Sequence, residues 1–186
     1  MGRMALAPTY RRRLHERALD QYGYVSTRDA DEIGVPPGEL RKLSSRGGLE
    51  HVGHGLYRFE DIPRTGRDQF MEAVLRVGPD AYLQGEAVLA LHDLALANPR
   101  QIRVATPRRD RRQHPDFLKV ERRSLPAGER AVYEGIPATT VARALLDCRG
   151  VIMDERLIEA AREASRTGLL PRRDMQRVLG DLERPS

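Results

Sequence analysis

Residues able to support catalysis are few in this sequence of 186 residues. His51 and His54 have the H-x-x-H spacing of two metal ligands, but no carboxylate or cysteine set accompanies them. Asp116 and Glu121 do not amount to the carboxylate cluster that holds Mg²⁺ in a nuclease. The sequence also lacks a Walker loop, a G-x-G-x-x-G motif and an H-E-x-x-H motif. We therefore expect no catalytic site, no metal and no cofactor, and a metal-dependent nuclease is the least favoured function.

The single cysteine, Cys148, excludes an internal disulfide framework and a cysteine-based zinc site. Val141, Ala144 and Leu145 precede it at helical spacing, which predicts a buried and unreactive thiol.

No apolar run approaches the roughly 20 residues that cross a bilayer. The segment from Met1 to Arg13 lacks the apolar stretch of a signal peptide. We therefore expect a cytoplasmic protein with no membrane partner.

The chemistry that the sequence does offer is that of arginine. The net charge is +5 and the sequence pI is about 9.8. Residues 100–123 hold nine Lys and Arg against three Asp and Glu, whereas residues 1–62 are nearly balanced. Only Lys42 and Lys119 are lysines, and the planar fork of arginine suits phosphates and guanine edges. The charge indicates a polyanionic partner, although a GC-rich genome would produce the same arginine bias.

The first arginine-bearing segment lies between Gly34 and Phe59. Pro36-Pro37 can open a helix on which Leu40 and Leu43 face inward. The outward positions are then polar or charged, and we assign DNA binding to four of them: Arg41, Lys42, Ser45 and Arg46. Glu39 also faces outward, where it could accept a hydrogen bond from cytosine or favour the helix N-terminus. Solvent-exposed arginines of this kind are also common in proteins that never contact nucleic acid.

The elements around this helix position it as a recognition helix would be positioned. An amphipathic helix is predicted from Thr9 to Tyr22, and Ser26 and Asp29 form the capping box of a second helix. After the Pro36-Pro37 helix, strands at 49–52 and 56–59 flank a Gly53-His54-Gly55 turn. This order predicts a winged helix-turn-helix over residues 1–62. The same arrangement adds Arg28, His54 and Arg58 to the candidate DNA contacts.

A second domain is predicted over residues 63–186, because Pro63 and Gly66 interrupt the pattern and the charge balance changes. Helices are expected at 68–77 and 85–94, followed by three short extended segments at 102–104, 118–120 and 132–138. Three helices follow, at 139–148, 154–167 and 171–182. The fold class is therefore α+β: a winged helix-turn-helix, then a small mixed α/β domain with a short sheet and C-terminal helices.

Four arginines, Arg108, Arg109, Arg111 and Arg112, fall between Pro107 and Pro115 on a predicted exposed loop. They are candidate phosphate contacts. An equally reasonable interpretation is a charged loop that only keeps the protein in solution. If the first interpretation is right, removing these arginines weakens binding to all DNA sequences alike and flattens the salt dependence.

The stretch YVSTRDADEIGVPPGELRKLSSRGGLEHVGHGLYR resembles the N-terminal winged helix of the AbiEi-type antitoxins of bacterial type IV toxin–antitoxin systems. The segments GEAVLALHDLA, GIPATTVARALLDC and REASRTGLL are similar to the domain that follows in those proteins, so the resemblance extends from about Tyr10 to Leu182. It implies a protein that binds inverted repeats in double-stranded DNA and represses its own operon. It also implies that the second domain counteracts a co-encoded nucleotidyltransferase toxin, directly or indirectly.

The resemblance assigns no antitoxin role to single residues, and the outer faces of the helices from Thr139 to Leu182 are the candidate region. We expect a monomer or a weak dimer. Two other functions stay open: a stand-alone winged-helix regulator whose second domain senses a ligand or mediates assembly, and an interaction protein whose arginines bind an acidic partner. A neighbouring nucleotidyltransferase gene would favour the antitoxin over the stand-alone regulator.

Overall fold

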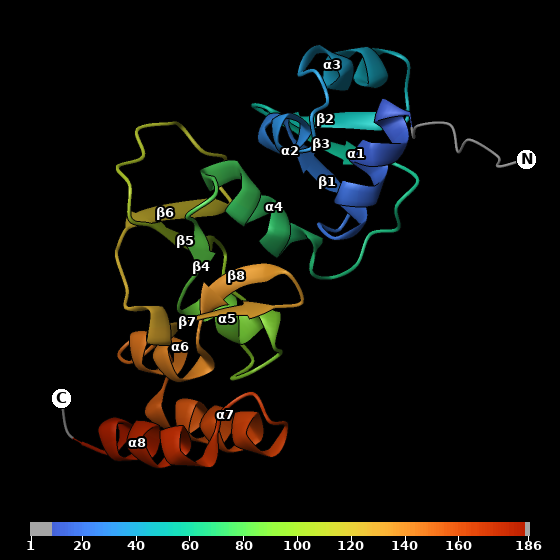
Figure 1. The fold of residues 1–186 in the computed structure, drawn as a ribbon. Coiled ribbons are helices and arrows are strands. Elements are labelled where there is room, and N and C mark those ends of the chain that lie inside the picture. The colour runs from blue at the N-terminus through green and yellow to red at the C-terminus, as the bar shows by residue number, and fades with distance from the viewer. Residues whose placement is uncertain (1–8, 185–186) are drawn as a thin grey trace, which may run out of the picture. The chain divides into compact units, whose positions relative to one another are not determined.

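The computed structural model describes residues 9–184, and the chain divides into two compact units, Met1–Arg76 and Val77–Ser186. The outermost residues of the two predicted domains, 1–8 and 185–186, lie outside the described residues. Each unit combines helices with its own sheet, as Figure 1 shows, so the predicted α+β class is confirmed. The division falls after Arg76, whereas the sequence placed it at residue 62. The helix at 68–77, apart from its last residue, therefore groups with the first unit.

In the first unit three helices precede a β-hairpin, the order expected from the sequence. In chain order its elements are α1 (Tyr10–Leu19), β1 (Tyr24–Ser26), α2 (Thr27–Glu32), α3 (Gly38–Ser45), β2 (Leu49–Gly53), β3 (Leu56–Phe59) and α4 (Asp68–Val77). The three strands form an antiparallel sheet in the order β1-β3-β2, so β3 is the central strand. The hairpin β2-β3 follows α3 directly, where a wing would lie.

Local sequence signals explain where these helices begin. The Ser26 side chain accepts a hydrogen bond from the Asp29 backbone, and the Asp29 carboxylate accepts one from the Ser26 backbone, so the predicted capping box is present. The Thr9 side chain caps α1 in the same way. However, α1 ends at Leu19, and Tyr22, which the sequence placed on its buried face, lies beyond it at φ 56°. The sequence also missed the short strand β1.

The core of the first unit is assembled from one face each of α1, α2 and α3 and from one face of the sheet. Its buried apolar residues are Leu14, Ala18, Val25, Ala30, Val35, Leu40, Leu49, Tyr57, Phe59 and Ile62. Leu43, expected to face inward, is partly buried against this cluster. The predicted inward residues of α3 thus fix which of its sides remains exposed.

The second unit is built on a mixed five-stranded sheet. Its elements are β4 (Tyr82–Leu83), α5 (Glu86–Leu91), β5 (Ile102–Thr106), β6 (Leu118–Arg122), the 3₁₀ turn η1 (Ala127–Glu129), β7 (Arg130–Tyr133), β8 (Ile136–Thr139), α6 (Val141–Asp147), α7 (Asp154–Arg166) and α8 (Arg172–Leu182). The strand order is β6-β5-β4-β8-β7. Among the described residues, no helix is long and apolar enough to cross a bilayer.

Two features of this sheet differ from the prediction. The weak extended segment at 132–138 is a hairpin, because Glu134 and Gly135 both have positive φ, as a two-residue turn between right-twisted strands requires. Strand β4 has two residues, too few for a period-two pattern to appear in the sequence.

Cys148 is fully buried at the end of α6, and burial raises the pKa of its thiol to about 12.

Candidate nucleic-acid interface

Helix α3 of the first unit presents a polar face to solvent. Pro37 precedes the helix in helical conformation, where a missing N–H leaves no hydrogen bond unmade. Leu40 is fully buried on the inner side. The outer side carries the predicted candidates, all exposed: Arg41, Lys42, Ser45 and Arg46. The structure therefore places Arg41, Lys42 and Ser45 on this short helix and Arg46 at its C-cap.

The cations on and near α3 differ in how far they are already neutralised. Lys42 Nζ lies 2.7 Å from Glu39 Oε1, and Arg28 Nε lies 2.8 Å from Glu32 Oε1. No acidic side chain within residues 9–184 pairs with Arg41 or Arg46. Because an unpaired guanidinium keeps all its donors for a ligand, these two arginines are the strongest candidates on α3 for contacts to DNA.

A hollow of about 540 Å³ lies between α3 and the β2-β3 hairpin. Arg41 and Ser45 line it from the helix side, and His54 lines it from the hairpin tip. Sequence reasoning missed the other side chains that line it: Thr27, Ser44, His51 and Tyr57. The register could have suggested one of them, because His51 pairs with Tyr57 across the hairpin and their ring centroids are 4.9 Å apart.

The tip of the hairpin is fixed against the start of α2. The Thr27 backbone N–H donates a 2.8 Å hydrogen bond to the Gly55 carbonyl oxygen. Gly55 has φ +64°, and a Cβ placed there would lie 2.8 Å from Thr27 Oγ1. The turn therefore needs glycine, and His54 projects beside a backbone that α2 holds in place.

The structure buries Arg58, which the sequence placed among the exposed candidate DNA contacts. It lies on the central strand β3, all four residues of which are buried, and its side chain is 3% exposed. Its guanidinium donates hydrogen bonds of 2.7 Å to the Ile62 carbonyl and 3.1 Å to the Phe59 carbonyl. Asp68 Oδ1 is 3.8 Å away. The sequence placed Arg58 on an exposed wing, but the residues that follow β3 cover its side chain.

Helix α4 also holds the hairpin in place, through a hydrogen bond to β2. The Arg76 guanidinium donates to the Val52 carbonyl oxygen of β2, and its Nε donates a 2.8 Å hydrogen bond to Glu72 Oε1. Tyr24 Oη donates a 2.8 Å hydrogen bond to the same carboxylate. Burial and the neighbouring Glu72 raise the pKa of Tyr24 above its usual range, so the phenol stays a donor. This contact explains why α4 groups with the first unit.

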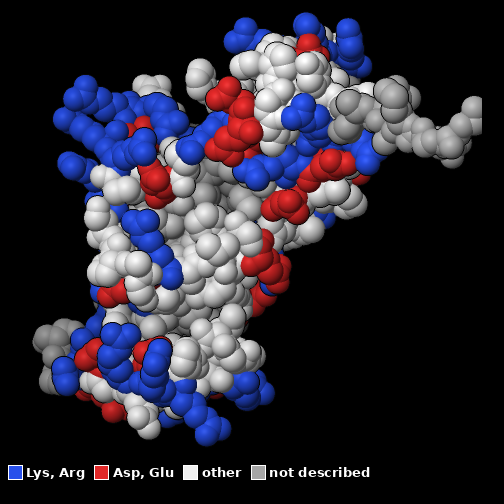
Figure 2. Space-filling model, in the orientation of Figure 1, with Lys and Arg blue, Asp and Glu red and all other residues white. Residues whose placement is uncertain are grey.

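The arginine run in the second unit lies on the loop that joins β5 to β6. These two strands are parallel neighbours, so the chain must return along the sheet before β6 begins. Figure 2 shows the blue side chains of Lys and Arg gathered over this loop at the upper left. All four predicted arginines of the run line one hollow of about 330 Å³.

Glu121, weighed above as a metal-binding carboxylate, is engaged with basic and amide groups of the sheet. Arg103 donates hydrogen bonds of 3.0 and 3.1 Å to it, and Gln84 donates one of 2.6 Å. Burial raises the pKa of Glu121, but the hydrogen bond and charge of Arg103 outweigh burial and leave the pKa below its usual value. Within residues 9–184, no group of three or more His, Cys, Asp or Glu is placed to hold a metal ion.

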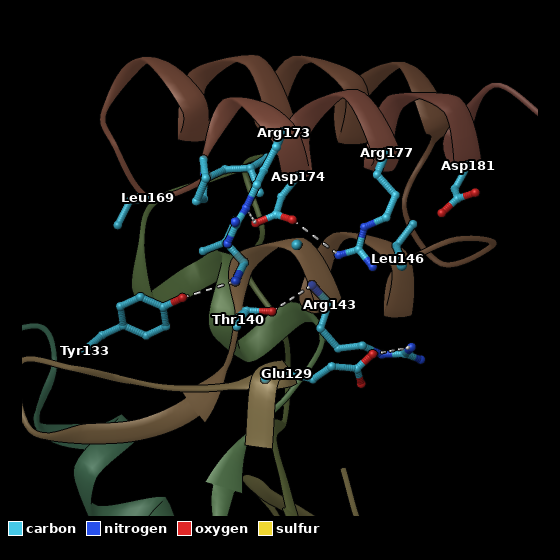
Figure 3. A pocket seen from close by; sticks show the side chains of 15 residues that line it. Glu129, Tyr133, Thr140, Arg143, Leu146, Leu169, Arg173, Asp174, Arg177 and Asp181 are labelled. Atoms are coloured by element: carbon cyan, nitrogen blue, oxygen red, sulfur yellow. Dashed lines mark hydrogen bonds and ion pairs between the residues drawn. The ribbon is translucent and has the colours of Figure 1, made fainter. Parts of the chain in front are cut away.

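A second hollow of the second unit, of about 460 Å³, lies between α6 and α8 (Figure 3). Its charges largely pair with one another. Arg143 Nη1 lies 3.7 Å from Glu129, and Arg177 Nη2 lies 3.8 Å from Asp174. Tyr133 Oη accepts a 3.1 Å hydrogen bond from the Val141 backbone. The hollow is polar and close to electrically balanced, in contrast to the arginine-lined hollow at the β5–β6 loop.

Comparison with known proteins points to a regulator. Residues 12–59 match the family model described as the transcriptional regulator AbiEi antitoxin, and they cover most of α1 and every element through β3. The chain is similar to the crystal structure of the RV2827C protein from Mycobacterium tuberculosis, with 18% identity and a TM-score of 0.47 over 96% of this chain and 73% of that chain. No curated protein matches. Over residues 12–59, about a quarter of its length, the chain is therefore similar to the AbiEi antitoxin family of transcriptional regulators.

Proposed function

We propose that this protein binds operator DNA through its first unit and represses transcription of its own operon. In this proposal α3 enters the major groove, where Arg41 contacts a base edge and Ser45 and Arg46 contact bases or phosphates. His54 on the hairpin tip and Arg28 at the start of α2 contact the adjacent backbone. A regulator of this kind acts in the bacterial cytoplasm, where its operator lies.

One observation carries the proposal: the hollow between α3 and the hairpin is lined by hydrogen-bonding side chains and contains an arginine without an acidic partner. A helix face that served only as solvent-exposed surface would not need a hairpin held in a fixed position beside it. Here the hydrogen bond from Thr27 to Gly55 and the Arg76 contact to Val52 hold the hairpin in place. Such preorganisation lowers the entropy lost on binding.

The test is binding of the protein to its own upstream DNA over a series of salt concentrations. The double variant Arg41→Ala/Lys42→Ala should lose sequence preference and weaken binding at least tenfold, since a bidentate base contact contributes about 1–3 kcal/mol. Arg162→Ala, which removes an exposed arginine of α7, is the matched control and should bind normally. If the wild-type protein does not distinguish its upstream DNA from an unrelated duplex, the proposal is wrong.

The antitoxin activity of the proposal falls on the second unit, where α6, α7 and α8 each carry both Arg and acidic side chains. We infer that the chain counteracts a nucleotidyltransferase toxin encoded beside it. Co-expression of the toxin with residues 1–186 should restore bacterial growth, and affinity purification of the pair shows whether neutralisation needs direct contact. Toxicity that persists at full antitoxin expression would remove this part of the proposal and leave DNA binding untouched.

A second candidate function is supported by the hollow between α6 and α8. Its volume lies within the range of about 300–1,000 Å³ that small-molecule sites occupy. Its balanced charges would suit a small ligand that carries both signs. A stand-alone regulator would then release its operator when this ligand binds. To test this alternative, operator binding is measured with and without free amino acids, the first probe. A change in operator affinity, together with the absence of a toxin gene nearby, would favour the ligand-sensing regulator.

A further inference from the structure

The loop between β5 and β6 is organised by one carboxylate. Asp110 accepts hydrogen bonds from the Arg112 backbone at 2.9 Å and from the Arg112 guanidinium at 3.0 and 2.6 Å. His114 Nε2 lies 3.0 Å from the same carboxylate. Arg112 donates a further 2.6 Å hydrogen bond to the Val77 carbonyl at the end of α4. The loop therefore has a defined conformation, although it contains no helix or strand.

The remaining arginines of the loop divide into one that is paired and two that are not. Arg108 Nε lies 2.6 Å from Asp80 Oδ2. Within residues 9–184, Arg109 and Arg111 make no ion pair or hydrogen bond through their side chains, and both are exposed. These two residues flank Asp110 in the sequence. The carboxylate that fixes the loop thus leaves its two neighbours with their full charge available.

We propose that the hollow lined by residues 77–80, 106 and 108–112 binds a backbone phosphate of DNA through Arg109 and Arg111, and that Asp110 is a positioning residue for these two arginines. The inference rests on the proposed function, because it takes DNA as the ligand. It adds a specific phosphate site and a role for an acidic residue beside it.

If only net charge mattered, replacing Asp110 would have the opposite effect on DNA affinity from the one that a positioning role predicts. A carboxylate next to a phosphate site repels the ligand, so its removal should strengthen binding if only net charge matters. A positioning role predicts the reverse. Without Asp110 the arginines must be ordered at the moment of binding, and each rotamer-rich side chain that is immobilised then lowers the affinity. The two explanations therefore differ in sign.

The experiment compares Asp110→Ala with Asp116→Ala, measured on the full chain with its upstream duplex and with an unrelated duplex of equal length. Asp116 is exposed on the same loop, and its carboxylate has no partner among the described residues. Both variants remove one negative charge. We expect Asp116→Ala to leave affinity equal or slightly higher, and Asp110→Ala to weaken binding to both duplexes about threefold to tenfold, with a shallower salt dependence. Thermal unfolding of each variant serves to verify folding.

A double-mutant cycle with Arg109→Ala/Arg111→Ala separates positioning from a general structural role. The arginine variant should weaken binding to both duplexes and reduce the salt slope by about 1 to 2. Adding Asp110→Ala to it should change affinity no further if Asp110 acts through these arginines. A loss that persists in this background would overturn the positioning role.

The outcomes distinguish this inference from the proposed function. If Asp110→Ala binds as tightly as Asp116→Ala, the inference is wrong, whether or not the operator is recognised. If the wild type binds both duplexes equally and Asp110→Ala weakens both, the phosphate site stands and operator recognition fails. If the wild type binds neither duplex, both proposals fail.

Discussion

Tyr24 Oη and Glu72 Oε2 are 2.8 Å apart, and their hydrogen bond joins strand β1 to helix α4. The two residues are 48 positions apart in the sequence, so neither local pattern predicts the contact. The same carboxylate accepts from Arg76, whose guanidinium also reaches the Val52 carbonyl of the hairpin. Glu72 therefore connects the sheet of the first unit with the helix that supports the hairpin.

Replacing Tyr24 by Phe should lower the free energy of unfolding by about 1 kcal/mol, the usual contribution of one hydrogen bond. The ring keeps its place in the core, and Glu72 keeps its bond from Arg76. Urea denaturation of the full chain measures the change. Leu19→Ala, a change of an exposed apolar residue, is the control and should have less effect. An unchanged midpoint for Tyr24→Phe would show that this contact does not stabilise the unit.

Gly55→Ala should destabilise the protein by about 1–2 kcal/mol, because the positive φ and the close Thr27 hydroxyl both oppose a Cβ. DNA affinity should fall as well, since the shift displaces the hairpin tip. Gly38→Ala is the matched control, because a Cβ at Gly38 meets nothing within 4 Å and alanine favours a helix. Denaturant unfolding and a DNA titration measure the two effects. Equal stability of the two variants would contradict the prediction.

Arg58→Leu should reduce stability by about 3 kcal/mol, because it leaves the carboxylate of Asp68 buried without its cation. Any loss of DNA binding should then follow the loss of folded protein and disappear where the variant is folded. Thermal unfolding followed by circular dichroism, beside a DNA titration at low temperature, makes the comparison. A fully folded Arg58→Leu variant that has lost DNA binding would restore Arg58 as a contact.

Asp29 should make stability depend on acid pH. Burial raises the pKa of this carboxyl, but hydrogen bonds from Ser26 and Arg17 outweigh burial and hold it below the ordinary value of 3.8. A depressed pKa in the folded state means that the stabilisation is complete above about pH 4 and is lost as pH falls through the folded pKa. Asp29→Asn should therefore be less stable by about 1–2 kcal/mol at pH 7.

The difference in unfolding free energy between wild type and Asp29→Asn should shrink as the pH is lowered from 4 toward 2. Denaturant unfolding at several pH values measures it. Asp31→Asn, on the exposed side of the same helix, is the control and should show no such convergence. A wild-type and Asp29→Asn difference that stays constant down to pH 2 would rule out the capping carboxylate as the titrating group.

The sequence by itself determined the elements that local rules control. The capping box at Ser26 and Asp29, the proline start of α3 and the glycine turn of the hairpin each act over a few residues, so their positions could be predicted. Leu40 fixed which side of α3 is buried and therefore which residues face outward. The resemblance to the AbiEi antitoxins also rested on this continuous stretch, and residues 12–59 match the model of that family.

Only the tertiary structure decided the roles of residues whose partners are distant in the chain. Arg58 is buried because the segment after β3 lies against it: its guanidinium donates to the Ile62 carbonyl and lies 3.8 Å from Asp68. Glu72 and Arg76 support the hairpin across more than 20 residues, and no periodicity records such a contact. Among the loop arginines, identical in type, Asp80 and Asp110 pair with Arg108 and Arg112 and leave the other two unpaired. Charge can be counted in a sequence, but which charges remain unpaired depends on distances that folding sets.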